Sequence, residues 1–146
     1  MKPFAWIASL AVVCALASPN AYALDAAGAK QVIDKFLGSR NEQGGIDAGQ
    51  HAIADLDGDG RPDIVLLWNV LGPTYFNPKL TLFLDQGRTY RTLTTDVTGQ
   101  TERVSVKGST ITVDTLMLGP NDARCCPTRK VQLQFRWQGG KLVALN

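Results

Sequence analysis

Short runs of alternating apolar and polar residues fill the second half of the chain. Val104 and Val106, and then Ile111 and Val113, each place apolar side chains on one face of an extended segment. Glycine-bearing turns of the kind that closes hairpins separate these runs. The pattern therefore predicts consecutive antiparallel strands. We expect them at residues 51–54, 64–71, 80–85, 90–94, 103–107, 110–116, 130–137 and 142–145.

The segment that precedes these strands has a different period. Its apolar residues recur at spacings of three and four, and Asp25 stands where a helix N-cap is wanted, so we expect a helix over residues 26–37. The polar, glycine-rich stretch 38–49 predicts a loop. Residues 64–68 are apolar at every position, which favours a central strand covered on both faces. The fold class is thus α+β: one domain over 24–146, with an N-terminal helix packed on an antiparallel β-meander of about 6–8 strands.

Residues 1–23 have the pattern of a secretory signal peptide. Lys2 is followed by an apolar run at 4–17 and by Ala21-Tyr22-Ala23, a small-x-small cleavage pattern. We expect cleavage near Ala23 and a mature protein that is periplasmic or secreted. Cys14 lies inside the apolar run, so we expect it to leave with the signal peptide and not to carry a lipid.

Charge and hydropathy narrow the choice of partners. The chain has a formal net charge of +2, without a long run of either sign, so we expect neither nucleic acid nor an anionic membrane as partner. No later segment is apolar over the roughly 20 residues that a membrane-spanning helix needs. We expect a monomer that binds an envelope protein or a glycan.

Aspartates crowd the junction between the first two predicted strands. In the sequence Asp55-Leu-Asp-Gly-Asp-Gly-Arg-Pro-Asp63, carboxylates occupy relative positions 1, 3, 5 and 9, and glycine occupies position 6. Calcium prefers six to eight oxygen ligands at about 2.3–2.6 Å, and a tightly wrapped loop can supply several of them. We expect a structural calcium ion held by the side chains of Asp55, Asp57, Asp59 and Asp63 and by the carbonyl of Arg61. The alternative is a solvated Asp-Gly turn that binds metal weakly or not at all.

The stretch 53–67, which surrounds these aspartates, resembles the calcium loops of FG-GAP and integrin-propeller blades, in which such a loop joins two strands. An EF-hand in its usual form is excluded, because its twelfth position should be Glu and here it is Leu66. A propeller needs about four to eight blades, and this chain contains one such loop. The resemblance therefore implies the local calcium loop and not the propeller fold.

Beyond the predicted signal peptide the chain contains two cysteines, Cys125 and Cys126, which are adjacent in the sequence. In an exported chain a disulfide is the first expectation, and here it would join neighbours along the backbone. An intermolecular bridge and a reduced pair are the alternatives. A redox or metal-thiolate role is a further alternative, although no nearby His or third Cys completes a zinc site.

The stretch Gly119-Pro-Asn-Asp-Ala-Arg-Cys-Cys-Pro-Thr128, together with the aspartate motif and the alternating strands, is similar to small exported bacterial proteins of the LppP/LprE lipoprotein type, which have a Cys-Cys-Pro segment. The likeness extends over most of residues 50–146. It implies an uncharacterised bacterial protein of the cell envelope.

Recognition is a better candidate activity than catalysis. His51 is the sole histidine, and no nucleophile can be assigned to it, so we predict no catalytic residues. Trp68, Tyr75 and Phe76 form the candidate binding surface, since aromatic side chains on a proline-bracketed loop give a rigid apolar contact. The alternative is that Tyr75 and Phe76 fold back onto the core.

Three classes of function remain open from the sequence. The first, which we favour, is a calcium-stabilised, non-enzymatic binding module of the envelope. The second is an inhibitor or immunity protein directed at a wall-degrading enzyme or a toxin. The third is a hydrolase, or a redox protein that uses the vicinal cysteines.

Overall fold

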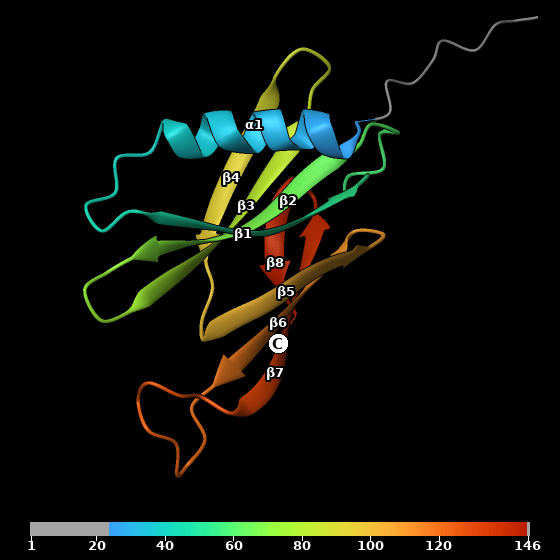
Figure 1. Cartoon of the computed structure of the whole chain (residues 1–146). Helices are drawn as coiled ribbons and strands as arrows, with labels where there is room; N and C mark the ends of the chain where they lie inside the picture. The colour runs from blue at the N-terminus through green and yellow to red at the C-terminus, as the bar shows by residue number, and fades with distance from the viewer. Residues whose placement is uncertain (1–23, 146) are drawn as a thin grey trace, which may run out of the picture.

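The computed structural model describes residues 24–145 as one helix and eight strands (Figure 1). These elements are α1 (Ala26–Gly38), β1 (Ile46–Ala54), β2 (Asp63–Leu71), β3 (Phe76–Asp85), β4 (Tyr90–Asp96), β5 (Gln100–Lys107), β6 (Thr110–Met117), β7 (Arg129–Gln138) and β8 (Lys141–Ala144). The helix and the eight strands overlap their predicted ranges, although β1 begins inside the predicted loop. The predicted signal peptide, with Cys14 and its cleavage site, lies outside the described residues.

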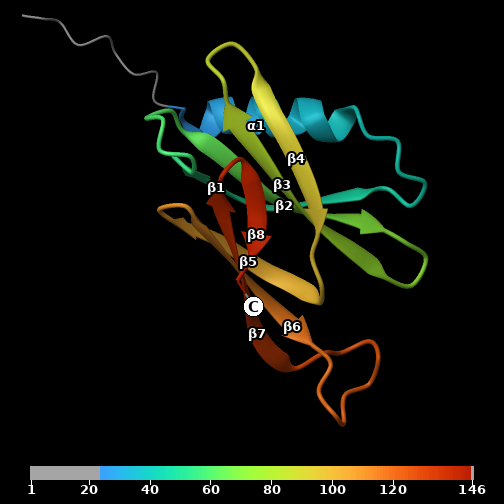
Figure 2. The same cartoon turned by 180° about the vertical axis from the view of Figure 1, so that it is seen from behind.

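The strands form two four-stranded sheets, ordered β1-β2-β3-β4 and β5-β6-β7-β8 (Figures 1 and 2). Within each sheet, strands that are consecutive in the chain pair antiparallel. The expectation of a single meander is therefore wrong: the meander breaks between β4 and β5, and the molecule is mostly β with one short helix. We call the sheet of β1–β4 the first sheet and that of β5–β8 the second sheet.

The break has a physical reason in the apolar faces of the two halves. The second sheet carries one apolar face, and folding back onto the first sheet removes both faces from water. Val97, in the connection, is buried in the same core, and the Thr115 hydroxyl donates a hydrogen bond of 3.0 Å to the Thr98 carbonyl. The core between the sheets consists of Leu56, Val65, Leu67, Leu80, Leu82, Leu84, Val97, Val104, Ile111, Val113 and Trp137.

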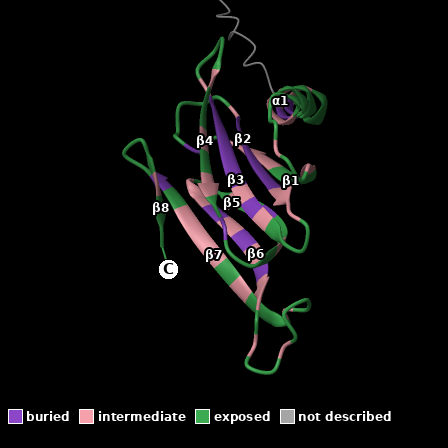
Figure 3. Ribbon diagram, turned by 90° about the vertical axis from the view of Figure 1, so that its left-hand side faces the viewer, coloured by how far each residue is buried: buried purple, intermediate pink, exposed green. Residues whose placement is uncertain are grey.

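Helix α1 covers the other face of the first sheet (Figures 1 and 3). The Asp25 carboxylate caps the helix by accepting the Gly28 N–H at 2.7 Å. The Phe36 ring meets the rings of Trp68 and Phe83 edge-on, at centroid distances of 5.8 and 5.0 Å. With apolar layers on both sides, residues 63–68 of β2 are all buried, which confirms the prediction of a central strand covered on both faces.

Strand β1 is longer than its hydrophobic pattern indicates. It begins at Ile46, within the stretch predicted as a loop, and residues 47–51 are exposed. Residues 46–48 pair with β2 in the register Ile46 to Val70, and the register shifts before His51, so backbone pairing forms extended structure there without apolar side chains to mark it.

The connections gather at two ends of this layered structure (Figures 1 and 2). The β1–β2 connection, which carries the aspartates, lies with the β5–β6 and β7–β8 turns at one end. The β2–β3 and β6–β7 connections, which carry Tyr75 and the cysteines, lie at the other. In the described residues, α1 is neither long nor apolar enough to cross a membrane.

Candidate functional site

The aspartate loop, residues 55–63, is wound around the carboxylate of Asp55. This carboxylate accepts the backbone N–H groups of Gly58 at 2.7 Å, Asp59 at 3.2 Å and Gly60 at 2.9 Å. Gly58 and Gly60 have φ values of +79° and +83°, which L side chains rarely adopt, so the glycines permit the tight wrap. The loop is thus held in place by its own first residue.

Asp63, the last residue of the loop, is completely buried. One of its oxygens accepts the Leu56 N–H and the other accepts the Asp85 N–H, both at 2.8 Å. Burial raises the pKa of Asp63; the two backbone N–H groups lower it, and the charges of Asp57 and Asp59 raise it further. Asp63 therefore joins the start of the loop to the end of β3, and burial of its carboxylate costs free energy that these hydrogen bonds offset.

Three of the four predicted carboxylate ligands come together. One oxygen each from Asp55, Asp57 and Asp63 lies within 4.8 Å of the others. Asp59 is not among them, because its carboxylate pairs with the guanidinium of Arg61 and accepts the Arg61 N–H at 2.8 Å. Arg61 also donates from Nε to the Asp85 carbonyl at 3.1 Å, so its side chain fastens the loop to β3.

A cleft of about 680 Å³ opens beside the aspartate loop, between the ends of the two sheets. Asp57 and Gln86 line it from the first sheet, and Trp137 lines it from the second. Arg91 crosses between the sheets: its guanidinium lies 5.6 Å from the centre of the Trp137 indole and donates to the Gly140 carbonyl at 3.3 Å. No local pattern predicts this cleft, because its walls come from four segments that lie far apart along the chain.

The predicted recognition residues do not all lie together. Tyr75 and Phe76 are 61% and 66% exposed, so they do not fold back onto the core. Trp68 is 2% exposed; it is covered by α1, and its indole N–H donates to the Thr81 hydroxyl at 2.9 Å. The two exposed aromatics share a hollow with the Cys-Cys-Pro segment. We call it the aromatic groove; it is lined by Thr74, Tyr75, Phe76, Gly99, Gln100, Leu116, Met117, Leu118, Arg124, Cys125, Pro127 and Arg129.

The β6–β7 connection that forms one wall of the groove is ordered around Asp122. Its carboxylate accepts the N–H groups of Gly119 and Thr128, both at 2.7 Å, and the Thr128 hydroxyl at 2.9 Å. These hydrogen bonds hold the pKa of Asp122 below its ordinary value. Within this connection the sulfur atoms of Cys125 and Cys126 lie against each other, and the disulfide between them stays a prediction.

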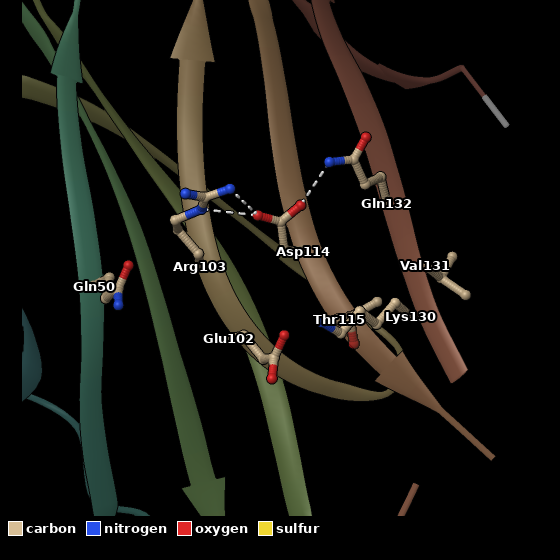
Figure 4. Close-up of a pocket in the computed structure, with 8 residues that line it drawn as sticks. All are labelled: Gln50, Glu102, Arg103, Asp114, Thr115, Lys130, Val131 and Gln132. Atoms are coloured by element: carbon tan, nitrogen blue, oxygen red, sulfur yellow. Dashed lines mark hydrogen bonds and ion pairs between the residues drawn. The ribbon is translucent and has the colours of Figure 1, made fainter. Parts of the chain in front are cut away.

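A polar row crosses the outer face of the second sheet (Figure 4). The Asp114 carboxylate accepts hydrogen bonds from Gln132 Nε2 and from Arg103 Nε, both at 2.8 Å. The Gln132 amide and the Arg103 guanidinium hold the pKa of Asp114 below its ordinary value. All three polar groups satisfy one another across β5, β6 and β7, so we assign this row to the stability of the sheet. His51 lies exposed on β1, opposite Leu66.

Comparison with known proteins gives one match. Residues 62–140, more than half of the chain, match the model of a family described as LppP/LprE lipoprotein. The matched range contains the Cys-Cys-Pro segment and the last two residues of the aspartate loop. No curated protein and no solved structure matches.

The substitution Asp63→Ala tests the role of the buried carboxylate. It leaves the N–H groups of Leu56 and Asp85 without their acceptor, and we expect it to lower the free energy of unfolding by about 2–5 kcal/mol in calcium-free buffer. Urea denaturation measures the change. The control is Asp47→Ala, at an exposed position on β1 outside the loop, with an expected effect within about 0.5 kcal/mol. Equal losses in the two variants would contradict the assignment.

The Asp122 hydrogen bonds make the order of the β6–β7 connection depend on pH. Because the folded-state pKa of Asp122 is depressed, its stabilising contribution is present above the unfolded pKa and disappears as the pH falls through the folded value. We expect the amide resonances of Gly119 and Thr128 to titrate together, with a midpoint below the ordinary aspartate pKa of about 3.9. The Asp122→Asn variant should show no such transition. A midpoint at or above the ordinary value would be incompatible with this network.

Proposed function

Because the chain belongs to the LppP/LprE lipoprotein family, we propose that it is an envelope protein that acts by binding, with calcium stabilising one end of the molecule and a protein or glycan partner held at the other. Membership in a lipoprotein family indicates an envelope-associated bacterial protein. Within the envelope, the signal-peptide pattern of residues 1–23 favours the periplasm or secretion after cleavage near Ala23.

The gathering of exposed apolar side chains at one groove carries the binding proposal. Five large hydrophobic side chains are exposed in residues 24–145, and three of them, Tyr75, Phe76 and Leu118, line the aromatic groove. Exposed apolar surface lowers the solubility of a protein unless a partner covers it. A cluster of exposed apolar side chains therefore marks an interaction site. The groove has a volume of about 680 Å³, within the range of about 300–1,000 Å³ that is usual for ligand sites.

The aspartate loop suits calcium in both chemistry and spacing. Two oxygens bound to one calcium ion at about 2.3–2.6 Å lie at most about 5 Å apart. The oxygens of Asp55, Asp57 and Asp63 lie within 4.8 Å of one another, inside that limit, which supports one ion as their shared partner. A cation there would also offset the repulsion among the carboxylates. Backbone carbonyls of the loop, including that of Arg61, and water would complete the ligand set.

The role of this calcium ion is structural. The loop joins β1 to β2, and Asp63 fastens it to β3, so a bound ion would stabilise the junction of three strands of the first sheet. The groove lies at the opposite end of the molecule, which separates the stabilising site from the binding site (Figures 1 and 2).

Calorimetric titration and thermal unfolding of the mature chain test the metal assignment. With a dissociation constant of about 10⁻⁴ M, as in many extracellular calcium sites, 1 mM calcium should stabilise the fold by about 1.4 kcal/mol and raise its melting temperature by several degrees. The variant Asp57→Asn should lose this response. Its control, Asp47→Asn, makes the same charge change at an exposed position on β1 and should keep it. Absence of heat and of any melting shift in the unmodified chain would refute the calcium site.

Affinity capture from envelope extract tests the binding function. We expect the immobilised mature chain to retain a defined protein or glycan, and the variant Tyr75→Ser/Phe76→Ser to lose it while melting at an unchanged temperature, because both side chains project into solvent. Val143→Ser, which removes an exposed hydrophobic side chain from β8, should behave as the unmodified chain. Retention that is equal in all three proteins would exclude the groove as the binding site.

A further inference from the structure

The charge and the lining of the aromatic groove indicate what kind of ligand it takes. Resting on the proposed binding function, we propose that the groove receives an extended peptide segment of a partner protein, in which a large apolar side chain is flanked by carboxylates. The inference depends on three features of the groove: its unpaired cations, its apolar floor and the rigidity of its two walls.

The charged residues that line the groove are all cations. Arg124 and Arg129 line it, and no Asp or Glu does. Both arginines are exposed, and neither side chain forms an ion pair or a hydrogen bond within residues 24–145, whereas Arg61 and Arg103 are both paired with aspartates. Guanidinium groups present a planar fork that matches a carboxylate, so this local excess of positive charge is complementary to an acidic ligand.

The floor of the groove favours a peptide over a glycan. Leu116, Met117, Leu118 and Pro127 line it together with the two aromatic rings, and the polar groups besides the arginines are the hydroxyls of Thr74 and Tyr75 and the amide of Gln100. A sugar carries hydroxyl groups around its ring, and each would need a hydrogen-bonding partner after burial. An apolar side chain needs none, and a flexible methionine adapts to its shape.

The aromatic wall is held in position by a glycine. The Gly72 N–H donates to the Tyr75 carbonyl at 2.9 Å, which closes the β2–β3 turn. The Tyr75 ring lies directly over Gly72, where a Cβ atom would come within 2.5 Å of the ring. Gly72 is outside the left-handed region, so alanine is compatible with its backbone and would displace only the ring. The variant Gly72→Ala therefore moves Tyr75 without removing it.

The opposite wall is equally fixed. Asp122 binds both ends of the segment 119–128, and the Cys126 N–H donates to the Ala123 carbonyl at 2.9 Å, so Arg124 stands within a hydrogen-bonded turn. Walls that are ordered before binding reduce the entropy lost when a flexible peptide docks.

Selection from a display library of random twelve-residue peptides on the immobilised mature chain tests the inference. We expect enrichment of peptides in which Leu, Phe or Trp stands beside Asp or Glu. For a fluorescently labelled synthetic copy of one enriched peptide, changing its acids to amides should weaken binding about tenfold or more, and high salt should weaken it too. Unmodified peptide should bind Arg124→Gln/Arg129→Gln and Gly72→Ala more weakly than the parent chain. The control Arg136→Gln, an exposed arginine on β7 that does not line the groove, should leave its affinity unchanged.

Several outcomes would overturn the inference. Enriched peptides without acidic residues would do so, as would affinity that is indifferent to the Arg124→Gln/Arg129→Gln change. So would binding to vesicles of anionic phospholipid or to a uronic-acid polysaccharide in place of the peptides. If the Tyr75→Ser/Phe76→Ser variant still loses its partner from envelope extract while acidic peptides fail to bind, the binding function stands and the ligand class is wrong. If no partner is retained from the extract either, the binding function fails as well.

Discussion

Burial of both faces of the first sheet is the constraint on which the rest of the structure depends. The six residues 63–68 of β2 are buried without interruption, so neither face of this strand can meet water. The helix supplies one cover through Phe36, and the second sheet supplies the other through residues such as Val113 and Trp137. Once these three layers are stacked, the connections between strands are left at the two ends, and both candidate sites are built from them.

Different kinds of side chain form the two ends of the molecule. At one end a buried carboxylate, Asp63, gathers backbone N–H groups and brings other aspartates beside it, which makes a compact anionic loop. At the other end, exposed aromatic side chains and unpaired arginines surround a hollow whose walls are ordered by Asp122. Asp63 and Asp122 play similar parts, because each carboxylate organises the backbone of its own connection. Asp63 ties the β1–β2 connection to the core. Asp122 makes its hydrogen bonds within the β6–β7 connection, so side chains such as that of Arg124 stay exposed there.

Parts of the candidate sites could be predicted to the extent that they are local in sequence. The aspartates lie within nine consecutive residues, so their spacing alone predicted that carboxylates gather in this loop, although the pairing of Asp59 with Arg61 was not evident. The sequence of their turn did not decide whether Tyr75 and Phe76 are exposed or packed on the core, and the fold leaves both exposed. Trp68 was assigned to the same surface and instead lies beneath the helix, because side chains alternate along a strand and the sequence did not say which face the helix would cover. The roles of Arg124 and Arg129 could not be predicted, because these residues lie far from Tyr75 and Phe76 along the chain and line the same groove only in the folded structure.

The sequence by itself determined the positions of the helix and the strands, the family resemblance and the aspartate motif. Each of these rests on residues that are close together along the chain, where periodicity, capping and turn chemistry act. The tertiary structure decided where the meander breaks and which loops meet. The β4–β5 connection contains a positive-φ glycine, Gly99, as several of the hairpin turns do, so this local signal does not distinguish a turn within a sheet from a crossing between sheets. That choice is made by the burial of two apolar faces against each other, an interaction between segments that lie tens of residues apart.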